Sequence, residues 1–240
     1  SRCLGELEQQ NAIPDFAIAQ FDASGIFGLS PKLYGRDAEL KLLLQFFSRA
    51  VSGGFELVLV GGYSGIGKSR IIKELGKPIR DRNGFFVEGK FDQLKRDLPY
   101  SAMGEALSGL THHVLSLPDQ GFSQWQQKLR HALGGNGPFI ATLLPELELI
   151  VGPQPELPTL SALESESRVK AAFISFLKCF ATESHPLVVF LDDLQWADTA
   201  SLKLIESLAL DSTDRHLLLI GAYRDNEVDG AHPLTRLTQS

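Results

Sequence analysis

The stretch GYSGIGKS at residues 62–69 limits the possible folds of this chain more than any other feature. It fits the pattern G-x-x-x-x-G-K-[ST] in full, and it stands between the apolar run ELVLVG and a segment with helical apolar periodicity. Glycines at these spacings let backbone N–H groups curl around phosphate oxygens, because no Cβ stands in the way. With a strand before it and a helix after it, the motif predicts a phosphate-binding loop in an α/β fold rather than a chance glycine-rich turn.

The polar residues of this loop suggest separate tasks. Lys68 can supply positive charge to the β and γ phosphates of a nucleotide, and the Ser69 hydroxyl can coordinate Mg²⁺. The helix that follows offers the positive end of its dipole. The predicted nucleotide contacts in this stretch are Gly62, Tyr63, Ser64, Gly65, Ile66, Gly67, Lys68, Ser69 and Arg70.

A second acidic motif follows an apolar run, LVVFLDD, at residues 187–193. A carboxylate at the end of such a strand suits a Walker B role, so we expect Asp192 on the metal side of the site. Asp193 is then placed to orient or deprotonate a water that attacks the γ phosphate. The alternative for Asp193 is that it only caps the turn that follows.

The other apolar patterns predict alternating helices and strands. A helix is expected over 37–51 and another after the loop, bent or broken near Pro78. Asp198 can cap a further helix whose Leu202, Ile205 and Ala209 face inward. Nearly continuous apolar strands are typical of a parallel sheet covered on both faces, so we expect a three-layer α/β architecture. The strands are predicted over 56–61, where the strand is expected to be buried, and over 84–91, 187–193 and 216–223.

A long helical segment separates the two halves of the predicted site. Lys68 and Asp192 are 124 positions apart, whereas a minimal domain of this type needs only one or two βα units between them. The surplus, about residues 99–182, is predicted to be a helical insertion between the second and third strands. It either packs beside the nucleotide site or forms a partner surface.

Charge and composition narrow the classes of function. The net charge is −6 and no basic run is long, so we expect no nucleic acid partner. Two cysteines and no apolar run near 18 residues favour a cytoplasmic setting without a membrane span. His112 and His113 have no ligand at metal spacing beside them and are interpreted as ordinary side chains. The first residue is Ser, which we interpret as the start of a piece excised from a longer protein.

Six stretches of the sequence resemble the AAA-type ATPase domain of the STAND class, the signal-transduction ATPases with numerous domains. They are KLYGRDAELKLLL, LVGGYSGIGKS, GKFDQLKRDLPYSA, PELELIVGPQPELP, HPLVVFLDDLQWAD and LLLIGAYRDNEV. The resemblance covers residues 32 to about 238 and is greatest to the module found in large bacterial, notably cyanobacterial, multi-sensor Ser/Thr–histidine hybrid kinases. It implies ATP or ADP with Mg²⁺ as cofactors. It also implies attached kinase and sensor domains as partners, and nucleotide-dependent assembly of copies.

The resemblance also implies two further groups of site residues. Arg224, at the end of the last strand, is similar to a sensor residue that approaches the γ phosphate; the alternative is a surface salt bridge with Asp225 or Glu227. Trp196 is interpreted as a packing residue. The motif LYGRDAEL implies contacts near the adenine, with a simple helix start as the alternative; the residues concerned are Leu33, Tyr34, Gly35 and Arg36.

The family's pattern is expected to continue past this sequence. The resemblance implies a P-loop NTPase core of the ASCE/AAA type over residues 31–240. Residues 1–30 are weakly periodic and contain several breakers, so the residues themselves indicate a linker or a partly ordered arm there. The strand order implied by the resemblance would be 5-1-4-3-2, with strand five, a helical lid and a winged helix placed beyond Ser240. Without strand five, strand one keeps an unpaired edge, and such edges invite pairing with other chains. We therefore expect weak hydrolysis from this segment alone.

These patterns favour a regulatory ATPase module that uses MgATP binding and hydrolysis as a conformational switch. The alternative is a nucleotide-binding scaffold that links kinase domains without hydrolysis. A GTPase would need an N-K-x-D motif, and no Asn in the chain is followed by Lys. A small-molecule kinase would need an acceptor pocket and a basic lid, neither of which the sequence indicates.

Overall fold

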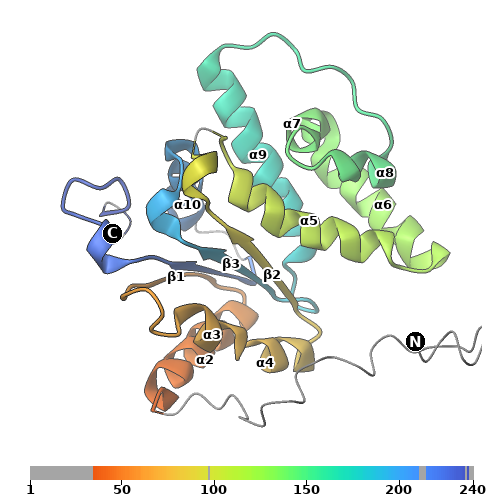
Figure 1. Ribbon diagram of the computed structural model, residues 1–240. Coiled ribbons are helices and arrows are strands. Elements are labelled where there is room, and N and C mark those ends of the chain that lie inside the picture. Colours follow the sequence, from red (N-terminus) through yellow and green to blue (C-terminus); the bar gives the residue numbers. More distant parts are fainter. Residues whose placement is uncertain (1–34, 97, 211–214, 236, 238–240) are drawn as a thin grey trace, which may run out of the picture. The chain divides into compact units, whose positions relative to one another are not determined.

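The computed structural model describes residues 35–96, 98–210, 215–235 and 237, so the predicted linker over 1–30 lies outside the described residues. The helices on the two faces of the sheet, with the strands between them, can be followed in Figure 1. In chain order the elements are α2 Asp37–Val51, β1 Phe55–Val60, α3 Lys68–Lys73, α4 Gly76–Asp81, β2 Phe85–Lys90, η3 Gln93–Lys95, α5 Ser101–Leu115, α6 Asp119–Leu133, η4 Gly134–Asn136, α7 Gly137–Ala141, η5 Pro145–Leu147, α8 Glu148–Val151, α9 Ala162–Phe180, β3 Leu187–Asp192, η6 Leu194–Trp196, α10 Thr199–Leu210, β4 Leu217–Ala222 and η7 Asp225–Glu227.

The four strands form one parallel sheet in the order β1-β4-β3-β2. The chain therefore runs from β1 at one edge to β2 at the other, and then returns to fill the middle with β3 and β4. This confirms the predicted α/β class and the predicted order of the four strands. Because all four strands are parallel, their carboxyl ends lie along one edge of the sheet, and the predicted site residues of the loop, Asp192, Asp193 and Arg224 follow or end those strands.

The two middle strands are buried, and β1 is not. Every residue of β4 and nearly every residue of β3 is buried, because helices cover both faces of the sheet. All six residues of β1 are half-exposed, which corrects the prediction of a buried strand over 56–61. The reason is that β1 pairs only with β4, so its other side has no neighbouring strand among the described residues.

The helices beside the loop follow the apolar periodicity closely. The predicted bounds of α2 are confirmed, and its Leu43, Phe47 and Ala50 are buried on one face. The next helix is broken near Pro78, as predicted: α3 ends at Lys73 and α4 begins at Gly76. Two backbone N–H groups there bond three residues back instead of four, which tightens the turn. Pro78 then lies in the first turn of α4, where the missing N–H has no helical partner to lose.

Between β2 and β3 the chain is helical, as predicted for residues 99–182. Three aromatic side chains of α9, at Phe173, Phe176 and Phe180, are fully buried, and Trp125 of α6 stacks on Phe180 with 4.5 Å between ring centres. Gly89 of β2 brings the sheet very close to α5, since a Cβ there would overlap the Ala102 carbonyl oxygen. The helical segment is therefore packed directly on the sheet.

None of the helices in the described ranges has both the length and the apolar character that crossing a bilayer requires.

Glu146 in this helical segment carries a testable pH dependence. Partial burial alone would raise the pKa of its carboxyl, but hydrogen bonds from Ser108 at 2.5 Å, from the backbone and from Thr111 at 3.3 Å outweigh it, so the pKa lies below the ordinary 4.5. The unfolded chain then takes up the proton more readily than the folded one. The stabilisation is present above pH 4.5 and is lost as the pH falls through the folded pKa.

We expect Glu146→Gln to lower the free energy of unfolding at pH 7 by about 1–2 kcal/mol, since a neutral acceptor replaces a charged one. Urea unfolding at pH 7 and below pH 4.5 measures the difference between the two proteins, which should shrink at the lower pH. The exposed Glu156→Gln is the control and should change little at either pH. A difference that is the same at both pH values would contradict the prediction.

Candidate functional site

The loop after β1 has the backbone geometry that only glycine adopts easily. Gly62, Gly65 and Gly67 have φ angles of 147°, 78° and 95°, all in the region that L side chains rarely enter. Gly61 lies against the segment that follows β4, because a Cβ there would come within 2.8 Å of the Tyr223 hydroxyl. The glycines therefore shape the loop and also let it approach the end of β4.

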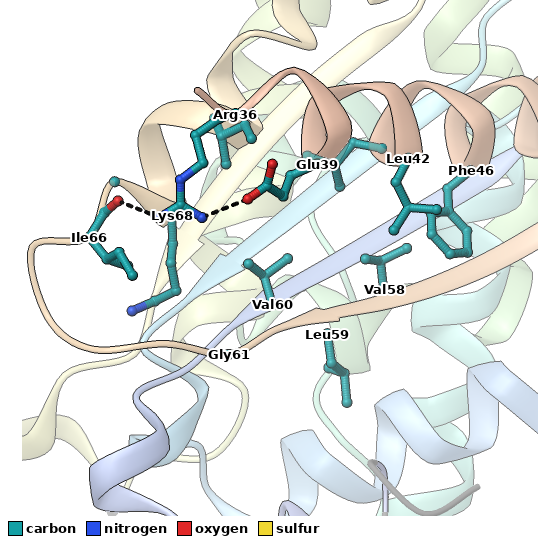
Figure 2. Close-up of a pocket in the computed structure, with 13 residues that line it drawn as sticks. Arg36, Glu39, Leu42, Phe46, Val58, Leu59, Val60, Gly61, Ile66 and Lys68 are labelled. Atoms are coloured by element: carbon teal, nitrogen blue, oxygen red, sulfur yellow. Dashed lines mark hydrogen bonds and ion pairs between the residues drawn. The ribbon is translucent and has the colours of Figure 1, made fainter. Parts of the chain in front are cut away.

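Lys68 is half-buried at the start of α3, and its side chain turns back into the loop. The amine donates hydrogen bonds to the carbonyl oxygens of Gly62 at 2.6 Å and Tyr63 at 2.9 Å. Figure 2 shows the side chain extending into the arc between Gly61 and Ile66. A positive charge is thus held inside the loop, where its neighbours are backbone atoms. The Tyr63, Ser64 and Ile66 side chains are exposed, and Arg70 is an exposed residue of α3.

The structure brings Ser69 and Asp192 together across 123 positions of sequence. The Ser69 hydroxyl donates a hydrogen bond of 2.7 Å to Asp192 Oδ2, while Asp192 Oδ1 accepts from the Asp193 backbone N–H at 3.0 Å. The loop at the end of β1 and the acid at the end of β3 therefore meet at the same edge of the sheet. A hydroxyl and a carboxylate side by side are oxygen ligands of the kind that Mg²⁺ prefers.

No group of three or more His, Cys, Asp or Glu side chains in the described ranges could hold a metal ion by itself. Mg²⁺ in nucleotide sites is usually held by one or two protein oxygens together with phosphate oxygens and waters, and Ser69 and Asp192 provide two such oxygens side by side. Ser69 and Asp192 thus fit Mg²⁺ bound with a nucleotide, and a dedicated protein cage is not needed. His112 and His113 are exposed residues of α5.

Asp193 is buried at 7% exposure, and protein donors occupy both of its carboxylate oxygens. Oδ1 accepts from Gln195 Nε2 at 2.9 Å and lies 3.3 Å from Arg224 Nε. Oδ2 lies 3.3 Å from the amine of Lys90. The residue leaves the strand with a left-handed backbone, at φ 55°, so its side chain departs from the direction that the strand would give it.

Sequence reasoning did not identify Lys90 or Gln195 as site residues. Lys90 is the last residue of β2 and stands opposite Asp192 in the sheet register, so knowledge of the strand order would have found it. Gln195 would have needed knowledge of the turn η6, which brings its amide back onto Asp193. The first signal depends on tertiary placement and the second on the conformation of a short turn, and neither follows from apolar periodicity or from a motif.

Arg224 forms the salt bridge with Glu227 that was weighed as the alternative to a sensor role, and it also contacts Asp193. Its guanidinium forms an ion pair of 2.8 Å with Glu227 and reaches Asp193 as well, and it lies 4.9 Å from the centre of the Trp196 ring. The hydrogen bond with Glu227 and the charges of Asp193, Glu227 and Asp192 raise the pKa of Arg224. Trp196 packs against the hydrophobic core, as expected, and the Arg224 guanidinium also contacts its ring.

An apolar cavity of about 260 Å³ lies beside the loop, between α2 and β1. Figure 2 shows Arg36 and Glu39 near Ile66 and Lys68 at one end of it. Arg36 donates to Glu39 at 2.9 Å and to the Ile66 carbonyl at 3.4 Å. Backbone hydrogen bonding, followed by the bond from Arg36, lowers the pKa of Glu39. The apolar side chains that line the cavity include Leu42, Leu43, Phe46, Val58, Val60, Ile66 and Ile71.

This cavity has the apolar lining and the position that a nucleobase next to a phosphate loop would need. Arg36 lines it, and Gly35 lies one residue before Arg36 with φ 78°. Leu33 and Tyr34, which were expected near the base, lie outside the described residues. Glu39 was not predicted, although its place three residues after Arg36 on a helix could have indicated it.

Comparison with known proteins adds an independent observation. Residues 32–220 match the family described as AAA ATPase domain. The chain is 39% identical over 196 residues to hybrid signal transduction histidine kinase G of Dictyostelium discoideum, an alignment that covers 82% of this chain and 6% of that protein. It is 22% identical over 194 residues to histidine protein kinase 1 of Candida albicans, covering 75% of this chain and 8% of that protein. The chain thus spans less than a tenth of either relative.

Proposed function

This chain belongs to the AAA ATPase domain family, and from that premise we propose that it is the nucleotide-driven regulatory module of a larger signalling protein. In this proposal it binds MgATP, hydrolyses it, and differs in conformation between the ATP and ADP states. Both similar proteins are named as histidine kinases, which supports attached kinase and sensor domains as the recipients of the signal.

One observation carries the proposal. The ends of three strands bring a glycine-shaped loop with its lysine, a serine bonded to a carboxylate, and a second carboxylate paired with an arginine to one edge of the sheet. Phosphoryl transfer needs little covalent help from the protein and depends on positioning and on the neutralisation of charge. Each of these groups can supply either positioning or neutralisation of charge.

The roles follow from the chemistry of each group. Lys68 would hold the β and γ phosphates and neutralise their charge, and Ser69 with Asp192 would hold Mg²⁺. The metal supplies further neutralisation of phosphate charge when it is bound. Asp193 would orient the attacking water or accept its proton, and Arg224 would stabilise charge that develops on the γ phosphate. Arg36 and the apolar cavity would hold the adenine.

The position of Arg224 between Asp193 and Glu227 indicates how a switch would operate here. Arg224 is shared between Asp193 and Glu227, and its side chain is 26% exposed, so it can exchange partners without unfolding its surroundings. A γ phosphate would compete for this cation, and a diphosphate would not. The position of Arg224 would then report which nucleotide is bound.

A second candidate is a scaffold that binds nucleotide without hydrolysis. The observation in its favour is that Asp193 already pairs with two cations and a buried amide, as a purely structural carboxylate would, and only its Oδ2 keeps room for a further donor such as water. The two candidates predict the same binding of MgATP and different rates of hydrolysis.

Asp193→Asn separates them. If Asp193 serves the reaction, we expect the single-turnover rate at saturating MgATP to fall by about 100-fold while the affinity for MgATP stays close to that of the unchanged chain, because general-base contributions are of this size. Phosphate release from radiolabelled ATP with the protein in excess is the measurement. Asp81→Asn, on the exposed side of α4, is the control. Equal rates near background for the unchanged chain and for Asp193→Asn would favour the scaffold.

We also propose that the sheet has a fifth strand. The half-exposed β1 has apolar side chains on both faces: Val58 and Val60 line the cavity beside α2, and Leu57 and Leu59 line a second one beside α10. Both features support a fifth strand beside β1 in the longer protein, giving the order 5-1-4-3-2. The helices between β2 and β3 would then be an insertion on the P-loop core, with a surface available to partner domains.

A further inference from the structure

A buried glutamine joins the two charged residues that the proposed reaction depends on. Gln195 is 1% exposed in the turn η6, two residues after Asp193. Its Nε2 donates to Asp193 Oδ1 at 2.9 Å, and its Oε1 accepts from the Arg224 backbone N–H at 3.2 Å. The orientation of the amide follows from these partners, since the carboxylate can only accept and the backbone N–H can only donate.

We propose that Gln195 is a positioning residue for ATP hydrolysis: its amide fixes the direction of the Asp193 carboxylate and its distance from Arg224. This inference rests on the proposed function, because it concerns the reaction at the same site. Gln195 would touch neither nucleotide nor water, and it would act through Asp193 and the end of β4.

The other partners of Asp193 hold its carboxylate less firmly than Gln195 does. The Lys90 side chain is 62% exposed, so solvent screens its ion pair with Asp193. Arg224 divides its guanidinium between Asp193 and Glu227. The left-handed backbone of Asp193 leaves the strand geometry unable to set the side-chain direction. The buried Gln195 amide has one hydrogen bond to Asp193 and one to the Arg224 backbone. These bonds therefore remain when the Lys90 and Arg224 side chains move.

The backbone of Gln195 is itself held from two sides. Its carbonyl oxygen accepts from an Arg96 guanidinium nitrogen at 3.1 Å and contacts His232 Nε2 at 3.1 Å. His232 Nδ1 accepts from the Leu234 N–H at 3.2 Å, so Nε2 carries the proton and is the donor to Gln195. The segment after β2 and residues 232–234 thus fix the turn from outside. Contacts from two other segments therefore help to place the Gln195 amide, as a positioning role requires.

Gln195→Met tests the proposal, because methionine has a similar length and cannot form either amide hydrogen bond. We expect the single-turnover rate at saturating MgATP to fall by about 10- to 100-fold, since small misplacements of a reacting group cost up to this much. The affinity for MgATP, titrated separately, should change less than about threefold, because the amide contacts no part of the loop. Gln126→Met removes a comparable hydrogen bond, from its Nε2 to the Ile150 carbonyl, in the helical segment, and should leave the rate unchanged.

A double-mutant cycle distinguishes positioning from a general structural role. If Gln195 acts through Asp193, adding Gln195→Met to Asp193→Asn should lower the rate by less than about twofold more, because contacting residues that act as a unit are not additive. Full additivity of the two losses would overturn the proposal, and so would an unchanged rate in Gln195→Met. Thermal unfolding of each variant verifies that it is folded under the assay conditions.

Trp196 gives a readout that does not depend on turnover. The chain has two tryptophans, so Trp125→Phe leaves Trp196, under the Arg224 guanidinium, as the sole tryptophan. In this background the emission should differ between MgATP and MgADP, and Gln195→Met should remove most of that difference. If the unchanged chain binds MgATP without hydrolysis, the hydrolytic part of the proposed function fails, and this signal decides the role of Gln195. Retention of the full difference, or no nucleotide binding at all, would overturn the proposal.

Discussion

Lys68→Ala is expected to lower the affinity of the chain for MgATP by about 10- to 100-fold, since a hydrogen bond to a charged group contributes about 1.5–3 kcal/mol. The same change should lower the rate of hydrolysis by about a further 100- to 1000-fold, because it also removes a donor aimed at developing phosphate charge. The loop itself also loses two hydrogen bonds, because the Lys68 amine donates to the carbonyl oxygens of Gly62 and Tyr63. Titration with a fluorescent ATP analogue measures the affinity.

The matched control is Lys73→Ala. Lys73 is the last residue of the same helix α3, and its amine pairs with the exposed Glu88 at 2.9 Å. Lys73→Ala removes the same charge from the same helix as Lys68→Ala does. A general effect of charge would therefore lower the affinity for MgATP in both variants. Wild-type affinity in Lys68→Ala, with the protein folded, would contradict the assignment of GYSGIGKS as the phosphate loop.

Gly89→Ala is expected to lower the free energy of unfolding by about 3 kcal/mol or more, which is at the upper end for overpacking in a core. The added Cβ would overlap the Ala102 carbonyl oxygen and lie 2.8 Å from its carbon and 3.2 Å from the Ala106 nitrogen. These are backbone atoms of α5, so relief requires the whole helix to move off the sheet. Domains are commonly stable by only about 5–15 kcal/mol, so such a loss is large.

Urea unfolding of Gly89→Ala beside Gly135→Ala provides the measurement. Gly135 lies in η4, and a Cβ there would meet nothing within 4 Å, so this control should change the midpoint little. An unchanged midpoint in Gly89→Ala would mean that α5 does not press on β2 as closely as the structure has it. Since Lys90 is the next residue in β2, the variant should also disturb the pair between Lys90 and Asp193.

The fold could be predicted largely because its signals are local. An apolar face every three to four residues gave the bounds of α2, and uninterrupted apolar runs gave the strands of a parallel sheet. The exposure of β1 was predicted wrongly, since apolar letters indicate a strand without indicating its neighbours. Ala209 was expected to face inward and is exposed in the last turn of α10, whereas Leu208 is buried.

The capping of α10 was predictable from Asp198 alone. Its carboxylate accepts from the Ser201 backbone N–H at 2.8 Å, which confirms the predicted cap. The break near Pro78 was predicted, but the proline itself lies in the first turn of α4, where a missing N–H is tolerated, and does not end α3.

The candidate site also has residues that the sequence predicts and residues that only the structure identifies. Short sequence motifs predict the loop and the two acids, because phosphate and metal chemistry restricts both residue type and spacing. The partners of Asp193 have no such motif: the sheet order brings Lys90 and Arg224 to it, and the turn η6 brings Gln195.

Formal charge at the site edge is balanced, with Lys68, Lys90 and Arg224 set against Asp192, Asp193 and Glu227, while the whole chain carries −6. Such a surface offers an anionic nucleotide no long-range attraction, so its arrival is governed by diffusion without electrostatic steering. Added salt screens the repulsion from the rest of the chain more than it weakens the close contacts in the loop. The association rate constant should therefore hold steady or rise with ionic strength, unlike that of a protein whose basic surface gathers phosphates from solution.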